Sequence, residues 1–186
     1  MSFTAGGPND IVARIIGQYL SERLGQQFII ENKVGAGGNI GMAAVLSSPP
    51  DGYTIGFVAP NNAINATLYD KLPFDFVRDS APVAGTMLLT NVMVVHPDVP
   101  TIGETVPGYE AVVWYGIVAP KGTPPEIVDT LNKAVNAVLA DPKLKARLAE
   151  LGGEPMPMTP TQFGKFIADE SEKWAKVVKF SGAKPD

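Results

Sequence analysis

The chain has 186 residues, of which 45% are apolar and 18% are charged, and its net charge at pH 7 is −4. This composition is that of a globular protein, and the length allows one domain with a substantial core. No basic cluster suits nucleic acid as a partner, and the absence of cysteine excludes disulfides, thiolate metal sites and cysteine nucleophiles. No apolar run approaches the roughly 18 residues that span a bilayer, and the sequence as written shows no signal peptide.

Helices and strands alternate along the first third of the chain. A helix is predicted to begin at Pro8 and to end at Gly25, because proline suits the first helical position and glycine suits the end. A short β-type run at 28–31, a second helix at 39–46 and a strand at 53–59 follow. This alternation predicts an α/β fold with a mainly parallel central sheet flanked by helices.

The middle of the chain is more β-like and the last third is helical. Extended patterns cover 83–89, 92–96 and 111–119, and Thr-Pro-Pro-Glu at 123–126 and Thr-Pro-Thr-Gln at 159–162 are typical of capping boxes that open helices. The segment between the last two extended stretches has no hairpin signal such as Asn-Gly. Such a junction marks a place where a domain is inserted or has been lost, and we expect its flanking strands to lie in one sheet.

A glycine-rich stretch, GAGGNIG at 35–41, precedes the second predicted helix. It could hold a nucleotide phosphate, hold a ligand carboxylate, or form only a tight turn. A dinucleotide fingerprint requires glycine where Ile40 stands, and the Gly-Lys-Ser/Thr of a P-loop is absent. These departures disfavour the nucleotide and leave the carboxylate and the bare turn.

A second glycine turn, at Gly6 and Gly7, opens the first predicted helix. Two such turns at the same end of adjacent strands would converge, each offering backbone amides and the positive end of a helix dipole. Neither carries lysine or arginine, which favours a carboxylate over a polyphosphate. Asn61, Asn62 and Asn65 follow the third strand at the same end, where they either bond a ligand or form a turn.

Catalytic groups are poorly represented. The single histidine, His96, precedes a proline, no Gly-x-Ser-x-Gly elbow is present, and the carboxylates show no paired spacing. The sequence therefore predicts a protein that is not an enzyme and that carries neither a cofactor nor a metal.

The chain resembles the solute-binding proteins of tripartite tricarboxylate transporters, the Bug family. The resemblance covers nearly all of the chain, in the family's order, and is carried by FTAGGPNDIVARIIGQYLSERLGQQFIIENKVGAGGNIG, PPDGYTIGFV, LYDKLPFDFVRDSAPV and VPGYEAVVWYGIVAPKGTPPEIVDTLNKAVNAVL. It implies a periplasmic clamshell of the type II binding-protein kind, which captures small carboxylates and delivers them to membrane permease subunits.

The resemblance also implies where the ligand lies. In the family, the ligand carboxylate is held at the loops that match 3–7 and 35–39, which agrees with the interpretation of the two glycine turns. The expected ligand-binding residues are Phe3, Ala5, Gly6, Gly7, Gly35, Ala36, Gly37, Gly38, Asn39, Asn61 and Asn62.

The chain departs from the family at two places. Most of a second domain is missing at the junction, and the first strand is cut to Ser2, Phe3 and Thr4. We therefore expect a single α/β domain, 1–186, built from the segments 1–97 and 107–186, with binding impaired by the loss. A non-binding, self-associating scaffold or degenerate paralogue is the alternative. Because domain loss uncovers a cleft wall and a sheet position, we expect a homodimer or a swapped strand.

Overall fold

A computed structural model describes residues 3–91, 96, 102–105 and 112–185. Its sheet has four strands in the order β1-β3-β2-β4: β1 is Gly56–Val58, β3 is Val112–Pro120, β2 is Ser80–Thr90 and β4 is Gly153–Pro155. Every pair of neighbouring strands is antiparallel. The α/β class is confirmed, but the expectation of a mainly parallel sheet is wrong for the described strands. Alternation along the chain does not reveal which strands become neighbours, and that choice decides their relative direction.

The two long strands β2 and β3 form the centre of the sheet. Their register runs from Ser80 opposite Pro120 to Thr90 opposite Val112, with two irregularities in β2. The expected pairing of the stretches 92–96 and 111–119 in one sheet stays a prediction, because 92–96 lies, apart from His96, outside the described residues.

The N-terminal elements follow the sequence closely, with one exception. Helix α1 (Pro8–Leu24) ends at Gly25, whose φ of 66° is left-handed, and α2 (Asn39–Leu46) has the predicted bounds. A short 3-10 turn, η1 (Ala36–Gly38), precedes α2. The stretch 28–31, predicted as a strand, belongs to no strand of the described sheet, and β1 is shorter than predicted.

The remaining helices are α3 (Pro60–Leu68), α4 (Phe76–Asp79), α5 (Ile102–Thr105), α6 (Pro125–Leu139), α7 (Pro142–Glu150) and α8 (Pro160–Ser181). Thr159 and Gln162 form the predicted capping box of α8. The other predicted box does not form: the Thr123 hydroxyl donates to the Pro120 carbonyl, and Pro124 takes the N-cap position of α6. Within the described residues, no helix is both long and apolar enough to cross a bilayer.

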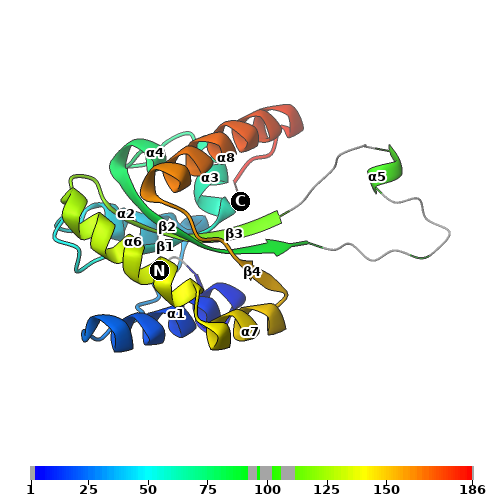
Figure 1. The fold of residues 1–186 in the computed structure, drawn as a ribbon. Helices are drawn as coiled ribbons and strands as arrows, with labels where there is room; N and C mark the ends of the chain where they lie inside the picture. The colour runs from blue at the N-terminus through cyan, green and yellow to red at the C-terminus, as the bar shows by residue number, and fades with distance from the viewer. Residues whose placement is uncertain (1–2, 92–95, 97–101, 106–111, 186) are drawn as a thin grey trace.

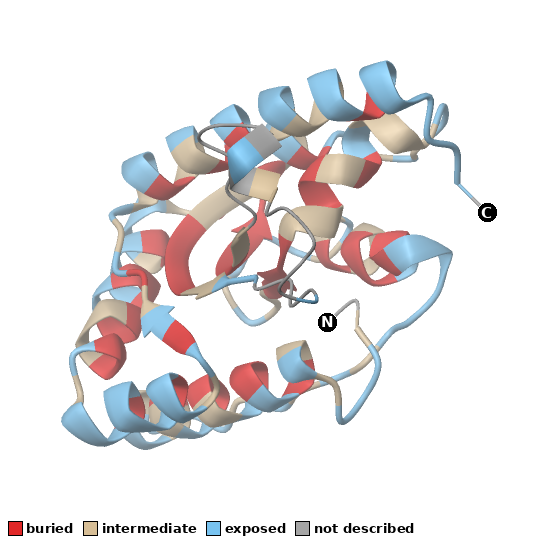
Figure 2. Ribbon diagram, turned by 90° about the vertical axis from the view of Figure 1, so that its right-hand side faces the viewer, coloured by how far each residue is buried: buried red, intermediate tan, exposed pale blue. Residues whose placement is uncertain are grey.

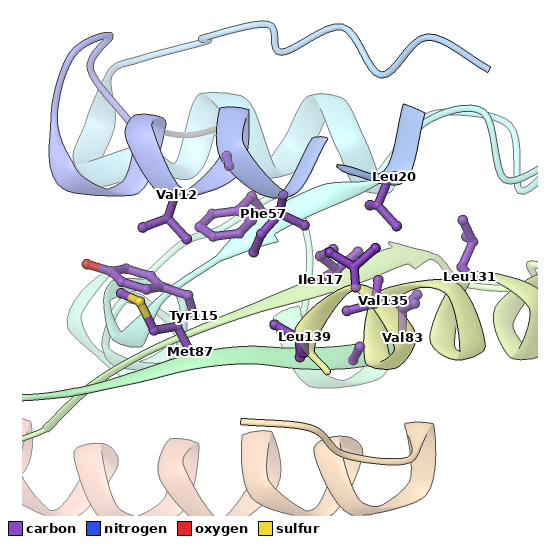
Figure 3. Packing of buried hydrophobic residues seen from close by; sticks show 14 of the residues in the cluster. Val12, Leu20, Phe57, Val83, Met87, Tyr115, Ile117, Leu131, Val135 and Leu139 are labelled. Atoms are coloured by element: carbon purple, nitrogen blue, oxygen red, sulfur yellow. The ribbon is translucent and has the colours of Figure 1, made fainter. Parts of the chain in front are cut away.

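Helices cover both faces of the sheet (Figure 1). Side chains of β3 alternate between two cores: Tyr115 and Ile117 pack with α1, α6 and α7, whereas Trp114 and Val118 pack with α2, α3, α4 and α8. Figure 3 shows the first core, in which residues of α1 and α6 point toward the strands. The buried residues lie on the sheet and on the inward helix faces, and the outer helix faces are exposed (Figure 2).

Candidate functional site

The glycine-rich stretch forms a left-handed turn directly before α2. Four consecutive residues have positive φ: Gly35 at 125°, Ala36 at 47°, Gly37 at 61° and Gly38 at 97°. Ala36 is the only described non-glycine residue with positive φ, a conformation that costs an L-residue about 1–2 kcal/mol. Such strain concentrates at ligand-binding sites, where the surrounding structure holds it in place.

Helix α3 holds this turn through its side chains. Asn61 Nδ2 and Asn65 Nδ2 both donate to the Gly37 carbonyl oxygen, at 2.9 and 3.0 Å, and Asn65 Nδ2 also lies 3.0 Å from Asn39 Oδ1. A Cβ at Gly37 would lie 3.0 Å from the Tyr69 hydroxyl. The turn is therefore fixed from one side by α3, and no larger residue fits at Gly37 without displacement.

Three buried polar atoms around this turn have no hydrogen-bond partner among the described residues. They are two donors, Asn39 Nδ2 and Asn62 Nδ2, and one acceptor, Asn61 Oδ1. Asn39 and Asn62 are themselves buried. Because buried polar groups are nearly always hydrogen-bonded, these three unpaired atoms are unusual.

The amides of the other glycine turn, before α1, are already hydrogen-bonded to nearby residues of the same segment. Gly6 has a φ of 80° and its amide donates to Asp10 Oδ2 at 2.8 Å, while the Gly7 amide lies 3.3 Å from the Thr4 carbonyl oxygen. Ala5 is exposed. The Asp10 carboxylate thus already occupies the positive end of α1, where an anionic ligand was expected.

Asp10 is buried at the centre of a polar network. Its carboxylate accepts from Arg14 Nε and from Asn32 Nδ2, both at 2.9 Å, and Asn32 Nδ2 also donates to the Phe3 carbonyl oxygen at 2.9 Å. The bond from Arg14, with that from the Gly6 amide, holds the pKa of Asp10 well below its ordinary value. No hydrogen bond between described residues joins the two glycine turns directly; Asn32, which precedes Gly35 by three residues, provides the nearest link.

Sequence reasoning found part of the asparagine cluster. Asn61 and Asn62 lie in the first turn of α3, where Asn62 Oδ1 accepts from the Ala59 amide at 3.0 Å and caps the helix. Asn65 was named with them as a ligand contact or turn former, whereas the contribution of Tyr69 was missed. A signal for Tyr69 exists, since residues 61, 65 and 69 are spaced by four.

Metal-binding clusters are not found in the part of the chain that the structure describes: no three histidine, aspartate or glutamate side chains there could hold an ion together. His96 is exposed. The arrangement of these residues can bind and orient an anion through amides.

Comparison with known proteins identifies the family of the chain. The tripartite tricarboxylate transporter family receptor, TctC, matches residues 12–104 and again residues 95–182. Protein BugT of Bordetella pertussis is 24% identical over 286 positions, covering 98% of this chain and 88% of BugT. Because the alignment is longer than the 186 residues of the chain, a long internal part of BugT has no counterpart here, and the chain is shorter than its relatives.

Two solved structures share the fold. The R. palustris protein Rpa4515, solved with adipate, is 25% identical with a TM-score of 0.84, covering 100% of this chain and 96% of its own. The periplasmic binding protein BugD is 22% identical with a TM-score of 0.85, covering 99% and 96%. The α/β fold of the chain is therefore that of these periplasmic binding proteins. These relatives are binding proteins, which supports the expectation of a protein that is not an enzyme.

Proposed function

The chain belongs to the tripartite tricarboxylate transporter receptor family, and we propose that it binds a small organic carboxylate as the solute-binding component of such a transporter. The observation that carries the proposal is the cluster of unpaired side-chain amide atoms on Asn39, Asn61 and Asn62 beside the left-handed turn of residues 35–38. Adipate in a relative's structure supports the same chemical class.

The chemistry of the turn suits a carboxylate. Asn39 and Asn62 each contribute an unpaired N–H donor, and the first-turn amides of α2 add the positive end of a helix dipole. A carboxylate accepts several such bonds without a lysine or arginine partner. The residues 3–7 also belong to the proposed site. Charge recognition is assigned to the turn before α2, because the Asp10 carboxylate already accepts the Gly6 amide at the turn before α1.

The same proposal covers the domain organisation. We infer a single domain formed from about 1–97 and 107–186, joined where the family carries a second domain. The long internal part of BugT without a counterpart supports this, and so do the two family matches, which meet near residue 100. One lobe supplies only part of the ligand contacts, so we expect weak, millimolar binding, equivalent to roughly 4 kcal/mol. Periplasmic location and permease partners are proposed on the same relationship to the family, and a homodimer or a swapped strand on the surface that the loss of a domain would uncover.

Titration calorimetry with adipate tests the proposal, with adipamide as the neutral ligand of the same length. We expect adipate to bind and adipamide not to bind. Asn61→Asp should abolish binding, because the new carboxylate repels both the ligand and the Gly37 carbonyl that Asn61 now holds.

Asn136→Asp is the matched control. Asn136 is also half-buried and also donates to a backbone carbonyl, that of Met158 at 3.1 Å, but it lies on α6. Its variant should bind adipate as the parent does. Equal loss in both variants, or equal binding of adipate and adipamide, would refute the proposed site.

A further inference from the structure

The two glycine turns differ in the hydrogen-bond donors that they still offer to an anion. The turn before α2 has no acidic residue in the first turn of its helix, and Asn39 and Asn62 beside it each keep an unpaired side-chain N–H while being buried. The turn before α1 has Asp10 in the first turn of its helix, and the Asp10 carboxylate accepts from the Gly6 amide at 2.8 Å. The turn before α1 therefore already holds a carboxylate, which belongs to the chain itself.

Asp10 and Arg14 form a charge pair at the turn before α1. Arg14 Nε lies 2.9 Å from Asp10 Oδ2, and the Asp10 side chain is only 4% exposed whereas that of Arg14 is 50% exposed. Asn32 Nδ2 donates to Asp10 Oδ1 at 2.9 Å, and Asn32 Oδ1 accepts from Arg14 Nη2 at 3.0 Å. Both oxygens of Asp10 are thus bonded within the chain, and one guanidinium offsets its negative charge.

Asn32 brings this charge pair close to the proposed carboxylate site. Its side chain is bonded to Asp10 and to the Phe3 carbonyl oxygen, and it precedes Gly35 by three residues. Three residues span at most about 11 Å even when the chain is fully extended. The far end of a six-carbon ligand held at the turn before α2 can therefore lie near Asp10 and Arg14.

We propose that the site prefers a ligand with a single carboxylate and an uncharged far end, a preference that rests on the proposed function. The carboxylate takes the donors at the turn before α2. At the other end, the two cations that the structure describes already have acidic partners: Arg14 pairs with Asp10, and Lys33 lies 3.6 Å from Glu31. A second carboxylate would lose water beside Asp10 without gaining an unpaired cation, whereas an amide or a hydroxyl costs less to desolvate.

Titration calorimetry at pH 7 with adipate and its monoamide, adipamate, tests the preference. The two ligands have the same length, but adipamate carries one negative charge where adipate carries two. We expect adipamate to bind the parent about threefold more tightly, an effect of the size measured between partly solvated charges. The quantity compared is the ratio of the two dissociation constants within one protein, so a loss of folded protein affects both ligands equally.

Two substitutions should move this ratio in opposite directions. Asp10→Asn leaves the Arg14 guanidinium without its carboxylate, so adipate should gain about fivefold relative to adipamate. Arg14→Gln leaves the Asp10 charge uncompensated, so adipate should lose about fivefold relative to adipamate. A role in folding alone would move the ratio in neither variant. Each variant decides the sign of the effect by itself, so the failure of one to fold leaves the test intact.

The matched controls are Asp169→Asn and Lys165→Gln, which break another ion pair of the same i,i+4 spacing, on α8. Both should keep the ratio of the parent. Adipate that binds the parent as tightly as adipamate, or more tightly, overturns the preference and leaves the proposed function standing. An unchanged ratio in Asp10→Asn and Arg14→Gln does the same. If neither ligand binds the parent, the proposed function itself is wrong.

Discussion

The side-chain amide of Asn65 lies 3.0 Å from the carbonyl oxygen of Gly37 and the same distance from Asn39 Oδ1, so one buried side chain connects the glycine turn and the first residue of α2 to α3. Asn65→Leu removes this donor and leaves two acceptors with fewer partners. We expect the free energy of unfolding to fall by about 1–3 kcal/mol, and adipate affinity to fall with it.

Urea unfolding measures the first effect and calorimetry the second. Asn91→Leu, at an exposed asparagine, is the control and should change neither quantity appreciably. If Asn65→Leu keeps full stability and full affinity, the turn does not depend on α3.

Gly37→Ala separates crowding from backbone strain at the same turn. Gly37 and Gly122 both have left-handed φ, 61° and 85°, but a Cβ at Gly37 would lie 3.0 Å from Tyr69 Oη and one at Gly122 would meet nothing within 4 Å. Strain alone costs about 1–2 kcal/mol at either site. We expect Gly37→Ala to lose more stability than Gly122→Ala in thermal unfolding, and to be the only one of the two to lose adipate binding.

Asp10 predicts a specific dependence of stability on pH. Its pKa in the folded protein lies well below the ordinary 3.8, owing chiefly to the bond from Arg14, so the unfolded chain binds its proton at a higher pH. The stabilisation is therefore present above about pH 4 and is lost as the pH falls through and below that value. Asp10→Asn should lower the free energy of unfolding at pH 7 by about 2 kcal/mol and should flatten its decline below pH 4.

Urea titrations between pH 3 and pH 7 compare the two proteins. Other carboxylates contribute to both curves, so the difference isolates Asp10. Asp169→Asn removes a partner of Lys165 in an exposed ion pair and should leave stability nearly unchanged. Parallel curves for the parent and Asp10→Asn would contradict the assignment.

Glu170 of α8 is hydrogen-bonded to Trp114 of the sheet and to Trp174 of its own helix. Its Oε2 accepts from Trp114 Nε1 at 2.8 Å and from Trp174 Nε1 at 3.1 Å. Glu170→Ala leaves the buried indole N–H of Trp114 unpaired, so we expect a loss of about 2 kcal/mol and a red shift of tryptophan emission. Glu170→Gln keeps an acceptor oxygen and should lose less.

The control is Glu172→Ala on the same helix, at an exposed residue paired with Lys176. Its emission spectrum should match that of the parent. An unshifted spectrum for Glu170→Ala would show that the two bonds do not position the indoles.

Local features of the fold could be predicted from the sequence because local interactions determine them. The bounds of α2 and the end of α1 at Gly25 follow from glycine and from apolar spacing, and the Thr159–Gln162 box follows from its own four residues. The Thr123 box failed because a strand-end carbonyl, that of Pro120, took the hydroxyl. A hydrogen bond to a residue outside the four-residue pattern therefore prevented this capping box.

Pairing between distant segments could not be predicted from the sequence. The run 28–31 has β-type residues, but a strand requires a neighbour, and the described sheet supplies none there. At the site, the two glycine turns and Asn61 were predicted as candidates, whereas the bond from Asn65 to Gly37 depends on how α3 packs against η1. The internal bond of Gly6 to Asp10 is local, and its spacing of four residues would have revealed it.

The short connection between β2 and β3 has a consequence for the order of folding. The ladder that begins at Thr90 and Val112 ends at Ser80 and Pro120, so its first pair is also the one closest in sequence. Loop closure costs about 0.6 kcal/mol more for each doubling of the connecting length. A longer connection at this place would raise the entropic cost of closing this ladder, and we expect refolding to start from β2 and β3 before β1 and β4 join.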